Sequence, residues 1–338
     1  MVAPPWFSIP PEGYGGIESM VHSLTEELTA RGHEVILIAA GQADTAAPVL
    51  ETYEEPLGGE RLGQAFPEVV HSLEAAAKLD GLEVDVVHDH TVAGPLAAAG
   101  RSAPTVVTAH SPVDGEIGRY YRGLPPEVGL VAISDAQRAM APQLNWLATV
   151  HNAIPVKDYP LQTEKEDFVL FLGRVSGEKA PDLAIQAARA AGRHLVVAAK
   201  CSEPVEQEYF QAKVQPLLGP DVDWVGEVDD DGKKRLLARA SALVFPIQWE
   251  EPFGIVMVEA MACGTPVVAL RRGSVPEVIV DQQTGFICDD LAELPAALQR
   301  VGELDPMRCR RHVEERFSVA PMTDGYEAVY RAVADLVE

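Results

Sequence analysis

Short, continuous runs of apolar residues recur along the whole chain and are rich in Val, Ile and Leu. They do not alternate polar with apolar positions, which is the pattern of strands buried on both faces of a parallel sheet. The runs predict strands over residues 34–40, 84–88, 105–110, 129–134, 168–173, 194–199, 222–226, 242–246 and 266–270.

Segments with helical spacing lie between these strands. The apolar residues from Ile17 to Leu28 fall on one stripe of a helix, and Gly32 follows as a helix-ending residue. Residues 182–192 and 233–242 repeat this pattern in the second half of the chain. Because strand and helix alternate throughout, we predict an α/β protein with parallel sheets.

The pattern restarts after a polar, proline-bearing and charged stretch at residues 151–168. We place a domain boundary there, with an N-terminal domain over 1–157 and a second domain over 158–318. Two doubly wound domains of this kind bind ligands at the carboxyl ends of their strands, in the cleft between them.

Length, charge and cysteine content exclude several classes of protein. A chain of 338 residues suits two domains, and its 47% apolar and 23% charged residues are typical of soluble globular proteins. The net charge of -24 disfavours nucleic acid and anionic lipid as partners. No apolar run could span a membrane, and the start of the chain lacks a basic region, so we expect no membrane insertion and no signal peptide. The four cysteines form no CxxC pair, so we expect reduced, packing cysteines and a cytoplasmic protein.

Glycines mark the first possible site. Gly13, Gly15 and Gly16 precede the first helix, after a short predicted N-terminal strand, where backbone amides could approach a phosphate. A plain connecting turn explains them about as well. The dinucleotide fingerprint would require glycine at position 18, where Glu18 stands, which argues against a nicotinamide cofactor.

Two basic residues mark the second possible site. Arg174 and Lys179 stand in the loop that follows a buried strand, and together they could hold an anion. Taken alone, they are more simply two solvated loop cations.

Two glutamates mark the third. Glu251 follows the strand at 242–246, and Phe253, Gly254 and Ile255 lie at the start of an apolar, buried helix that contains Glu259. A buried carboxylate requires a hydrogen-bonding partner, so Glu259 binds either a ligand or a group of the protein such as backbone or Arg. An exposed loop position is the simpler interpretation of Glu251. Together the two glutamates suggest a site for a polyol and a phosphate.

Histidines and aspartates raise the question of a metal. His88 and His90 stand two apart at a strand end, and His110 ends another strand. No third ligand of matching context accompanies the pair, so structural histidines are the better interpretation. Asp229, Asp230 and Asp231 lead into a helix, which favours a solvated helix start over a divalent-ion site.

These stretches together resemble the retaining glycosyltransferases of family 4, also called glycosyltransferase group 1, which have the GT-B fold. The family motif is two glutamates separated by seven residues, which stands here as Glu251-Pro-Phe-Gly-Ile-Val-Met-Val-Glu259 followed by "AMACGTPVVA". "GRVSGEK" resembles the family's Gly-Arg…Lys element, and "GGIESMVHSLTEELTARGHEVIL" its first glycine loop, helix and second strand. "VAISDAQR" and "VHNAIP" resemble the end of its first domain.

The resemblance implies a role for each candidate residue. Arg174 and Lys179 would grip the diphosphate of a nucleotide-sugar donor, and Glu251 would contact hydroxyls of the transferred sugar. The remaining implied contacts are sugar and phosphate for the amides of Phe253, Gly254 and Ile255, ribose hydroxyls for Glu259, phosphates for Gly15 and Gly16, and the donor sugar for His110. Of these residues, Glu251, His110, Arg174 and Lys179 would be catalytic.

The resemblance also implies a fold and a list of partners. It predicts two Rossmann-like domains that face each other across a cleft, and a final helix over 319–338 that crosses back to the first domain. The acceptor, a small molecule or glycan, would be held by the first domain, where 41–63 and 111–127 are predicted as irregular loops. The sequence does not indicate the oligomeric state.

The chain departs from the family pattern at three points. Ile247 stands where the family often has Ser, and Ala180 stands where it often has Gly. Lys200 and Cys201 replace glycines close to where the base of the nucleotide would bind, so the base is left open.

We therefore predict a cytoplasmic, retaining hexosyltransferase that uses a nucleotide diphosphate sugar. A UDP-sugar is favoured and GDP-mannose is possible. Cations and helix-start amides can stabilise the leaving diphosphate, so no metal or other cofactor is expected. The alternatives are a GT-B nucleotide-sugar epimerase, a glycosidase with Glu251 and Glu259 as acid and base, and a non-catalytic nucleotide-sugar binding protein. A basic clamp disfavours the glycosidase, because neutral glycosides need no diphosphate grip.

Overall fold

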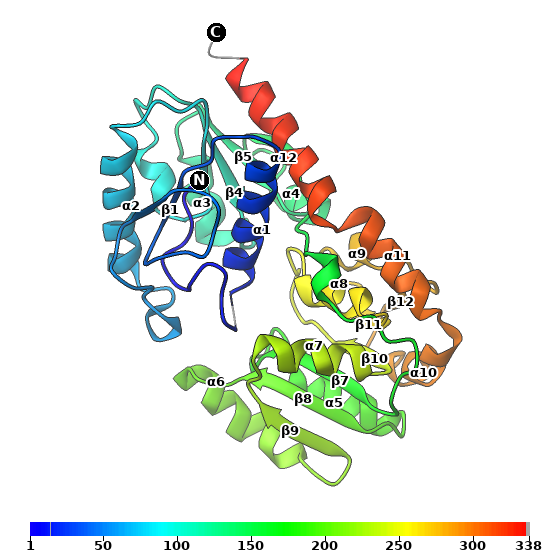
Figure 1. The fold of residues 1–338 in the computed structure, drawn as a ribbon. Coiled ribbons are helices and arrows are strands. Elements are labelled where there is room, and N and C mark those ends of the chain that lie inside the picture. Colours follow the sequence, from blue (N-terminus) through cyan, green and yellow to red (C-terminus); the bar gives the residue numbers. More distant parts are fainter. Residues whose placement is uncertain (14, 336–338) are drawn as a thin grey trace. The chain divides into compact units, whose positions relative to one another are not determined.

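The computed structural model describes residues 1–13 and 15–335 and divides into two compact units. The N-terminal unit consists of Met1–Ala153 together with Val319–Glu338, and the C-terminal unit consists of Ile154–Ser318. The chain therefore leaves the first unit, forms the whole of the second, and then returns (Figure 1). The last three residues of the predicted final helix, 336–338, lie outside the described residues.

The N-terminal unit alternates helix and strand. Its main elements are α1 (Gly16–Ala30), β1 (Leu37–Ala39), β2 (Val49–Glu51), α2 (Ala65–Leu79), β3 (Val87–Asp89), β4 (Thr105–Ala109), α3 (Gly115–Arg122), β5 (Val128–Ala132), α4 (Asp135–Met140), β6 (Trp146–Thr149) and α12 (Val319–Ala334). The strands form a four-stranded parallel sheet in the order β3-β4-β5-β6 and a parallel pair, β1-β2. Val2 joins the two through isolated bridges to Ile38 and Asp89, so the predicted N-terminal strand is reduced to these bridges.

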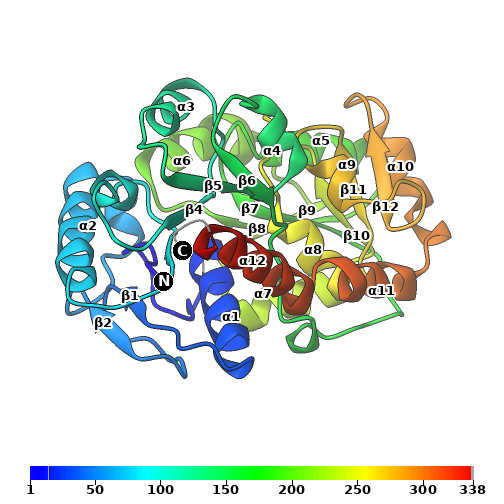
Figure 2. The ribbon, with the colours of Figure 1, turned by 90° about the horizontal axis from the view of Figure 1, so that it is seen from above.

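Helices α1 and α12 lie side by side on the N-terminal unit although they are far apart in sequence (Figures 1 and 2). The predicted stripe of α1, from Ile17 to Leu28, packs in one apolar core with Tyr326 and Val329 of α12 and with strand residues such as Val106. Arg31 donates to Asp324 at 2.6 Å and so also ties the end of α1 to α12. The residues after 318 thus complete the core of the first unit.

Two segments predicted as irregular loops contain regular structure. Residues 41–63 include β2 and a short 3-10 helix at Gly59–Arg61, and 111–127 include α3. The prediction was wrong because both elements are short. The strand β2 has three residues, and α3 has eight, of which four are glycine or tyrosine and have weak helical propensity, so neither element shows a clear apolar period. Pairing with β1 and packing of Tyr121 in the core fix these segments instead.

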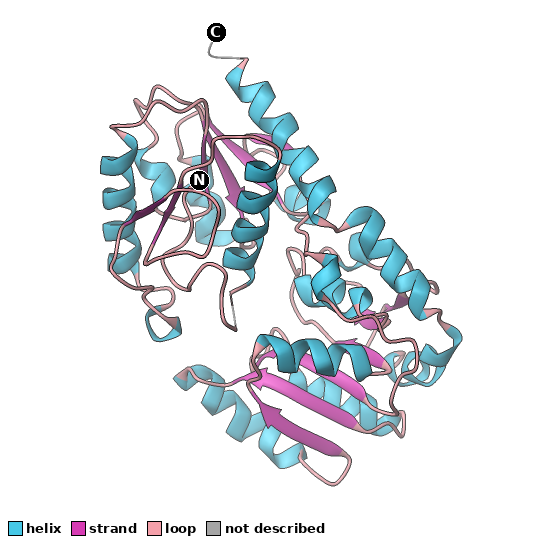
Figure 3. Cartoon of the chain, in the orientation of Figure 1, coloured by secondary structure: helices cyan, strands magenta, loops and turns pink. Residues whose placement is uncertain are grey.

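The C-terminal unit is built on a single six-stranded sheet. Its strands are β7 (Val169–Arg174), β8 (Leu195–Lys200), β9 (Val222–Gly226), β10 (Ala242–Phe245), β11 (Val267–Leu270) and β12 (Gly285–Cys288). Its helices are α5 (Pro181–Ala190), α6 (Pro204–Tyr209), α7 (Asp230–Arg239), α8 (Ile255–Ala262), α9 (Val275–Val278), α10 (Leu294–Arg300) and α11 (Pro306–Arg316). All strand pairs are parallel, in the order β12-β11-β10-β7-β8-β9 (Figure 3).

Helices cover both faces of this sheet, which explains why its strands read as continuous apolar runs. Alternate strand residues such as Phe171 and Val197 pack against Ile185 of α5 and Leu298 of α10. Helices α7 and α8 contact each other, and α8 contacts β10 and β11. Every strand predicted from an apolar run overlaps an observed strand, whereas β2, β6 and β12 were not predicted. The α/β class with parallel sheets is therefore confirmed.

The four cysteines are free, and three of them are buried. Among the residues that the structure describes, no helix combines the length and the apolar character needed to cross a bilayer.

Candidate functional site

The order of the six-stranded sheet creates a switch point between β7 and β10. From β7 the chain adds β8 and β9 on one side, and it then returns to add β10, β11 and β12 on the other. In open parallel sheets, ligands bind at the carboxyl ends of the strands at such a point, because the two outgoing loops diverge there. Arg174 is the last residue of β7, Lys179 lies in the loop after it, and Glu251 lies in the loop after β10. The structure thus brings these predicted residues to one edge of the sheet.

Glu251 is buried and receives two hydrogen bonds. It is only 7% exposed, and its Oε2 accepts from Lys179 Nζ at 2.5 Å and from Trp249 Nε1 at 2.9 Å. Lys179 Nζ also lies 5.6 Å from the ring centre of Phe245 and 5.3 Å from that of Trp249. The exposed loop position considered for Glu251 is therefore wrong, since the carboxylate needs these charged and polar donors to remain buried.

The side chain of Arg174 is more exposed to solvent than those of Lys179 and Glu251. Its nearest carboxylate is that of Glu178, with 3.9 Å between Nη2 and Oε2, and its side chain is 29% exposed. The backbone amide of Gln248 donates to the carbonyl of Glu178 at 2.8 Å, which joins the loop after β7 to the loop after β10. Arg174, which has only a distant carboxylate partner, and Lys179, which is paired with Glu251, therefore lie on two loops that are hydrogen-bonded to each other.

The start of α8 adds backbone donors at the same edge. Gly254 has φ of 71°, a conformation that favours glycine, and a Cβ there would also displace the end of the Met257 side chain, 2.7 Å away. Because α8 begins at Ile255, the amides of Ile255 and Val256 have no intrahelical acceptor, whereas the amide of Met257 donates to the carbonyl of Gly254 at 3.0 Å. The free amides and the helix dipole give this end of α8 a partial positive charge. Phe253 is buried and packs edge-on against Phe317, with 5.9 Å between ring centres.

Glu259 lies on α8 and is held by side chains from two other elements. Its Oε1 accepts from Tyr159 OH at 2.8 Å and from Lys233 Nζ at 2.7 Å, while the residue is 6% exposed. Burial by itself would lower the pKa of Lys233. The negative charges and hydrogen bonds of Glu259 and Asp230 outweigh this effect, so the pKa of Lys233 is raised above its usual value. The internal partners of Glu259 are thus Lys233 and Tyr159. The prediction that its internal partner would be a backbone group or an arginine was wrong.

The aspartates at 229–231 form a helix start, as predicted. Asp229 caps α7 by accepting from the amide of Gly232 at 2.7 Å, and Asp230 pairs with Lys233 and Lys234. No group of three or more His, Cys, Asp or Glu side chains suited to a metal ion occurs among the described residues.

The glycine loop and His110 belong to the N-terminal unit. Gly15 precedes α1 with φ of 151°, and a Cβ there would lie 2.8 Å from the Pro11 side chain; Gly16 is the first residue of α1. Burial raises the pKa of Glu18, in the first turn of α1, to about 7. His110 directly follows β4 and is half-buried, and its Nε2 lies 3.0 Å from Nδ1 of His90.

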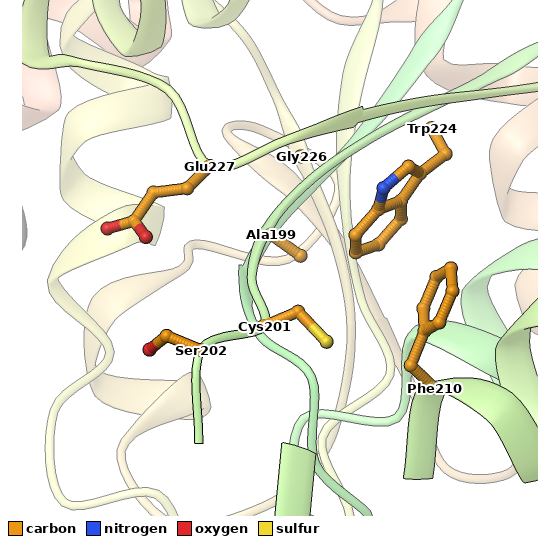
Figure 4. Close-up of a pocket in the computed structure, with 7 residues that line it drawn as sticks. All are labelled: Ala199, Cys201, Ser202, Phe210, Trp224, Gly226 and Glu227. Carbon is orange, nitrogen blue, oxygen red and sulfur yellow. The ribbon is translucent and has the colours of Figure 1, made fainter. Parts of the chain in front are cut away.

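A pocket of about 340 Å³ opens at the carboxyl ends of β8 and β9, next to the β7 end. Figure 4 shows the rings of Trp224 and Phe210 along one side and Ser202 and Glu227 on the other. The two ring centres are 4.5 Å apart. Lys200 ends β8 beside this pocket, and its ammonium is bonded to Glu203 at 2.6 Å and Glu206 at 3.3 Å.

The family can be decided from two overlapping matches. Residues 157–311 match the model of glycosyl transferases group 1, and residues 14–164 match the model of glycosyltransferase family 4, so nearly the whole chain is covered. The chain is a family 4 glycosyltransferase. Its two units of parallel strands are the Rossmann-like domains of the GT-B fold, which confirms the fold predicted from the sequence.

Several relatives of this family 4 glycosyltransferase match over most of their length. A glycogen synthase of Mycobacterium tuberculosis is 27% identical, over 89% of this chain and 86% of the relative. A phosphatidyl-myo-inositol mannosyltransferase of Mycobacterium leprae is 27% identical, over 98% and 91%. Among solved structures, AviGT4, a glycosyltransferase of avilamycin A biosynthesis, is 26% identical with a TM-score of 0.78, over 99% of this chain and 97% of AviGT4.

Three residues of this family 4 site were not predicted from the sequence. Trp249, Tyr159 and Lys233 donate to the two motif glutamates. Tyr159 and Lys233 are far from Glu259 in the chain, so no spacing rule links them to it. Trp249 stands two residues before Glu251 and could have been considered, since buried indole N–H groups usually find an acceptor.

Replacing Lys233 should cost more stability than replacing its neighbour. Lys233→Met removes one of two donors to a buried carboxylate, so we expect the free energy of unfolding to fall by about 1–3 kcal/mol. Lys234→Met is the matched control, because both ammonium groups pair with Asp230 but only that of Lys233 donates to Glu259. The ammonium of Lys234 also lies 5.1 Å from the ring centre of Tyr159, and we expect its two contacts together to contribute below about 1 kcal/mol. Urea unfolding of both variants measures the difference. Equal losses would contradict a supporting role for Lys233.

Proposed function

We propose that this family 4 enzyme is a retaining hexosyltransferase that moves a sugar from a nucleotide diphosphate sugar to an acceptor without a metal. The observation that supports this most directly is the arrangement at the β7–β10 switch point. There a buried carboxylate, Glu251, is bonded to the cation Lys179 and precedes the N-terminus of α8, while Arg174 ends the neighbouring strand β7.

The cations and the helix start suit the leaving group. Breaking the bond between the sugar and the diphosphate leaves an oxocarbenium-like sugar and adds negative charge to the diphosphate. Arg174, Lys179 and the first-turn amides of α8 would stabilise that charge as it develops. They would thereby supply what a divalent cation supplies in other transferases.

Glu251 has an oxygen left for the sugar. Both of its hydrogen bonds from described residues go to Oε2, so Oε1 could accept from a hydroxyl of the transferred sugar. The acceptor hydroxyl would attack from the face that the diphosphate leaves, and a phosphate oxygen would take its proton. The new bond would then keep the configuration of the old one. His110 would lie near the donor sugar, and Gly15 and Gly16 near the phosphates.

The pocket at Trp224 and Phe210 is our candidate for the nucleotide base, because aromatic rings can stack on one. A UDP-sugar is favoured, since a related structure, Anabaena Alr3699/HepE, was solved in complex with UDP and with UDP-glucose. GDP-mannose remains possible, because relatives include a mannosyltransferase. The acceptor would be a small molecule or glycan bound by the N-terminal unit, and the enzyme would act in the cytoplasm.

Replacing Glu251 should remove transfer but leave nucleotide binding. We expect Glu251→Gln to lower the rate of transfer by about 100-fold or more, because a positioned charged group is lost, while UDP affinity changes little. The measurements are formation of a new glycosidic bond and calorimetric titration with UDP. Glu250→Gln is the matched control: this exposed neighbour accepts from the amide of Gly273, which an amide oxygen can also do. Transfer by Glu251→Gln at the wild-type rate would refute the role of Glu251.

Chelation should not inhibit the enzyme. If Arg174, Lys179 and the α8 amides stabilise the diphosphate, transfer should continue at an unchanged rate in EDTA. The rate is measured with and without chelator on the same preparation. A loss that Mg²⁺ or Mn²⁺ restores would show that the protein's own cations are insufficient.

UDP should raise the melting temperature more than GDP or ADP does at equal concentration, because a ligand that binds only the folded state stabilises it. Thermal-shift measurements compare the three nucleotides and their sugars. Arg174→Gln should reduce whichever shift is observed. A larger shift with GDP would instead assign GDP-mannose or another GDP-sugar as donor.

A further inference from the structure

His88, His90 and His110 of the N-terminal unit lie in one network with α12, in which His88 and His90 are buried and His110 is half-buried. Both nitrogens of His88 are bonded to hydroxyls: Nδ1 to Tyr330 at 2.6 Å and Nε2 to Thr108 at 2.8 Å. Thr108 in turn bonds to the hydroxyl of Tyr326 at 2.9 Å. The ring of His88 is therefore fixed from both sides, by β4 and by α12.

His90 packs on that fixed ring and reaches His110. The ring centres of His88 and His90 are 4.0 Å apart, and Nδ1 of His90 lies 3.0 Å from Nε2 of His110. His90 is 4% exposed, and its other nitrogen, Nε2, has no hydrogen-bond partner among the described residues. The only polar contact that orients His90 is thus, in the described part of the chain, the one to His110.

All three rings are neutral near pH 7. Burial lowers the pKa of His88 and of His90 well below the usual value, and it lowers the pKa of His110 to about 3. A neutral imidazole has one N–H and one bare nitrogen. The bond between His90 and His110 therefore requires that one ring donates and the other accepts.

Either His110 donates to His90 or His90 donates to His110, and the unpaired nitrogen of His90 decides between these two arrangements. If His110 donated from Nε2, His90 would hold its proton on its own Nε2, and a buried N–H would have no acceptor. If His90 donates from Nδ1, the unpaired atom is only a bare acceptor. In folded proteins, a buried N–H donor without an acceptor is rarer than a buried acceptor without a donor. The second arrangement is therefore favoured, and it leaves the proton of His110 on Nδ1.

We propose that His90 is a positioning residue that donates from Nδ1 to His110 and thereby holds His110 in the tautomer with its proton on Nδ1. His110 then offers an N–H donor to a hydroxyl of the transferred sugar. The last clause rests on the proposed function, whereas the tautomer itself does not. The tyrosines of α12 support the arrangement by fixing His88, against which His90 packs.

Nitrogen NMR of the whole protein tests the tautomer without any reaction. In protein labelled with ¹⁵N-histidine, His110 should show a protonated Nδ1 and a bare Nε2, with a coupling across the bond to His90 Nδ1. The signals are assigned from their loss in His110→Asn and His90→Asn. A protonated Nε2 on His110 would overturn the proposal. The expected tautomer in a protein that transfers no sugar would instead contradict only the proposed function.

Two variants at position 90 test the effect on the reaction. His90→Asn keeps an N–H donor near the place of Nδ1, whereas His90→Leu is of similar size and has none. We expect kcat within about threefold of wild type for His90→Asn and about tenfold or more lower for His90→Leu, with UDP affinity unchanged in both. Equal loss of kcat in the two variants would assign His90 a merely structural role. Should His90→Leu fail to fold, the NMR measurement on the wild type still decides.

Discussion

The contact between Lys179 and Glu251 depends on how the six-stranded sheet is ordered. These residues meet because β7 and β10 are neighbours although helices α5, α6 and α7 and strands β8 and β9 separate them in the chain. The same adjacency joins the two loops through Gln248 and Glu178 and directs the start of α8 toward the same edge. A buried carboxylate would be unfavourable there without the lysine, so the charge arrangement and the fold constrain each other.

The sequence predicted the parts of the molecule that have strong local patterns. Runs such as 194–199 are long and apolar, so β8 was predicted almost as it stands, and the stripe from Ile17 to Leu28 predicted α1. The three-residue β2 and the short α3 have no such pattern, because pairing and packing with distant segments fix them. Local periodicity cannot report interactions that arise only after the chain has folded.

The site divides in the same way. Glu251, Glu259, Arg174 and Lys179 stand in recognisable motifs, and the structure gathers them in one unit at one sheet edge or on the helix beside it. Their partners could not be predicted from spacing: Tyr159 and Lys233 reach Glu259 from other elements. The pairing of His90 with His110 likewise depends on parallel neighbours β3 and β4, which bring strand ends together from separate parts of the chain. Ala180 is a different case. It adopts φ of 53°, a left-handed conformation that costs a residue with a Cβ more than it costs glycine, and no local sequence pattern predicts it.

The return of the chain to its first unit has a consequence for biosynthesis. Residues 154–318 form a complete unit inserted between two segments of another, and the later segment supplies Tyr326 and Tyr330 to the first unit's interior. On a ribosome, which releases the chain from its amino end, the inserted unit can fold before its host is whole. The N-terminal unit can complete its apolar core only after α12 has left the ribosome, and only then can Tyr330 bond to His88.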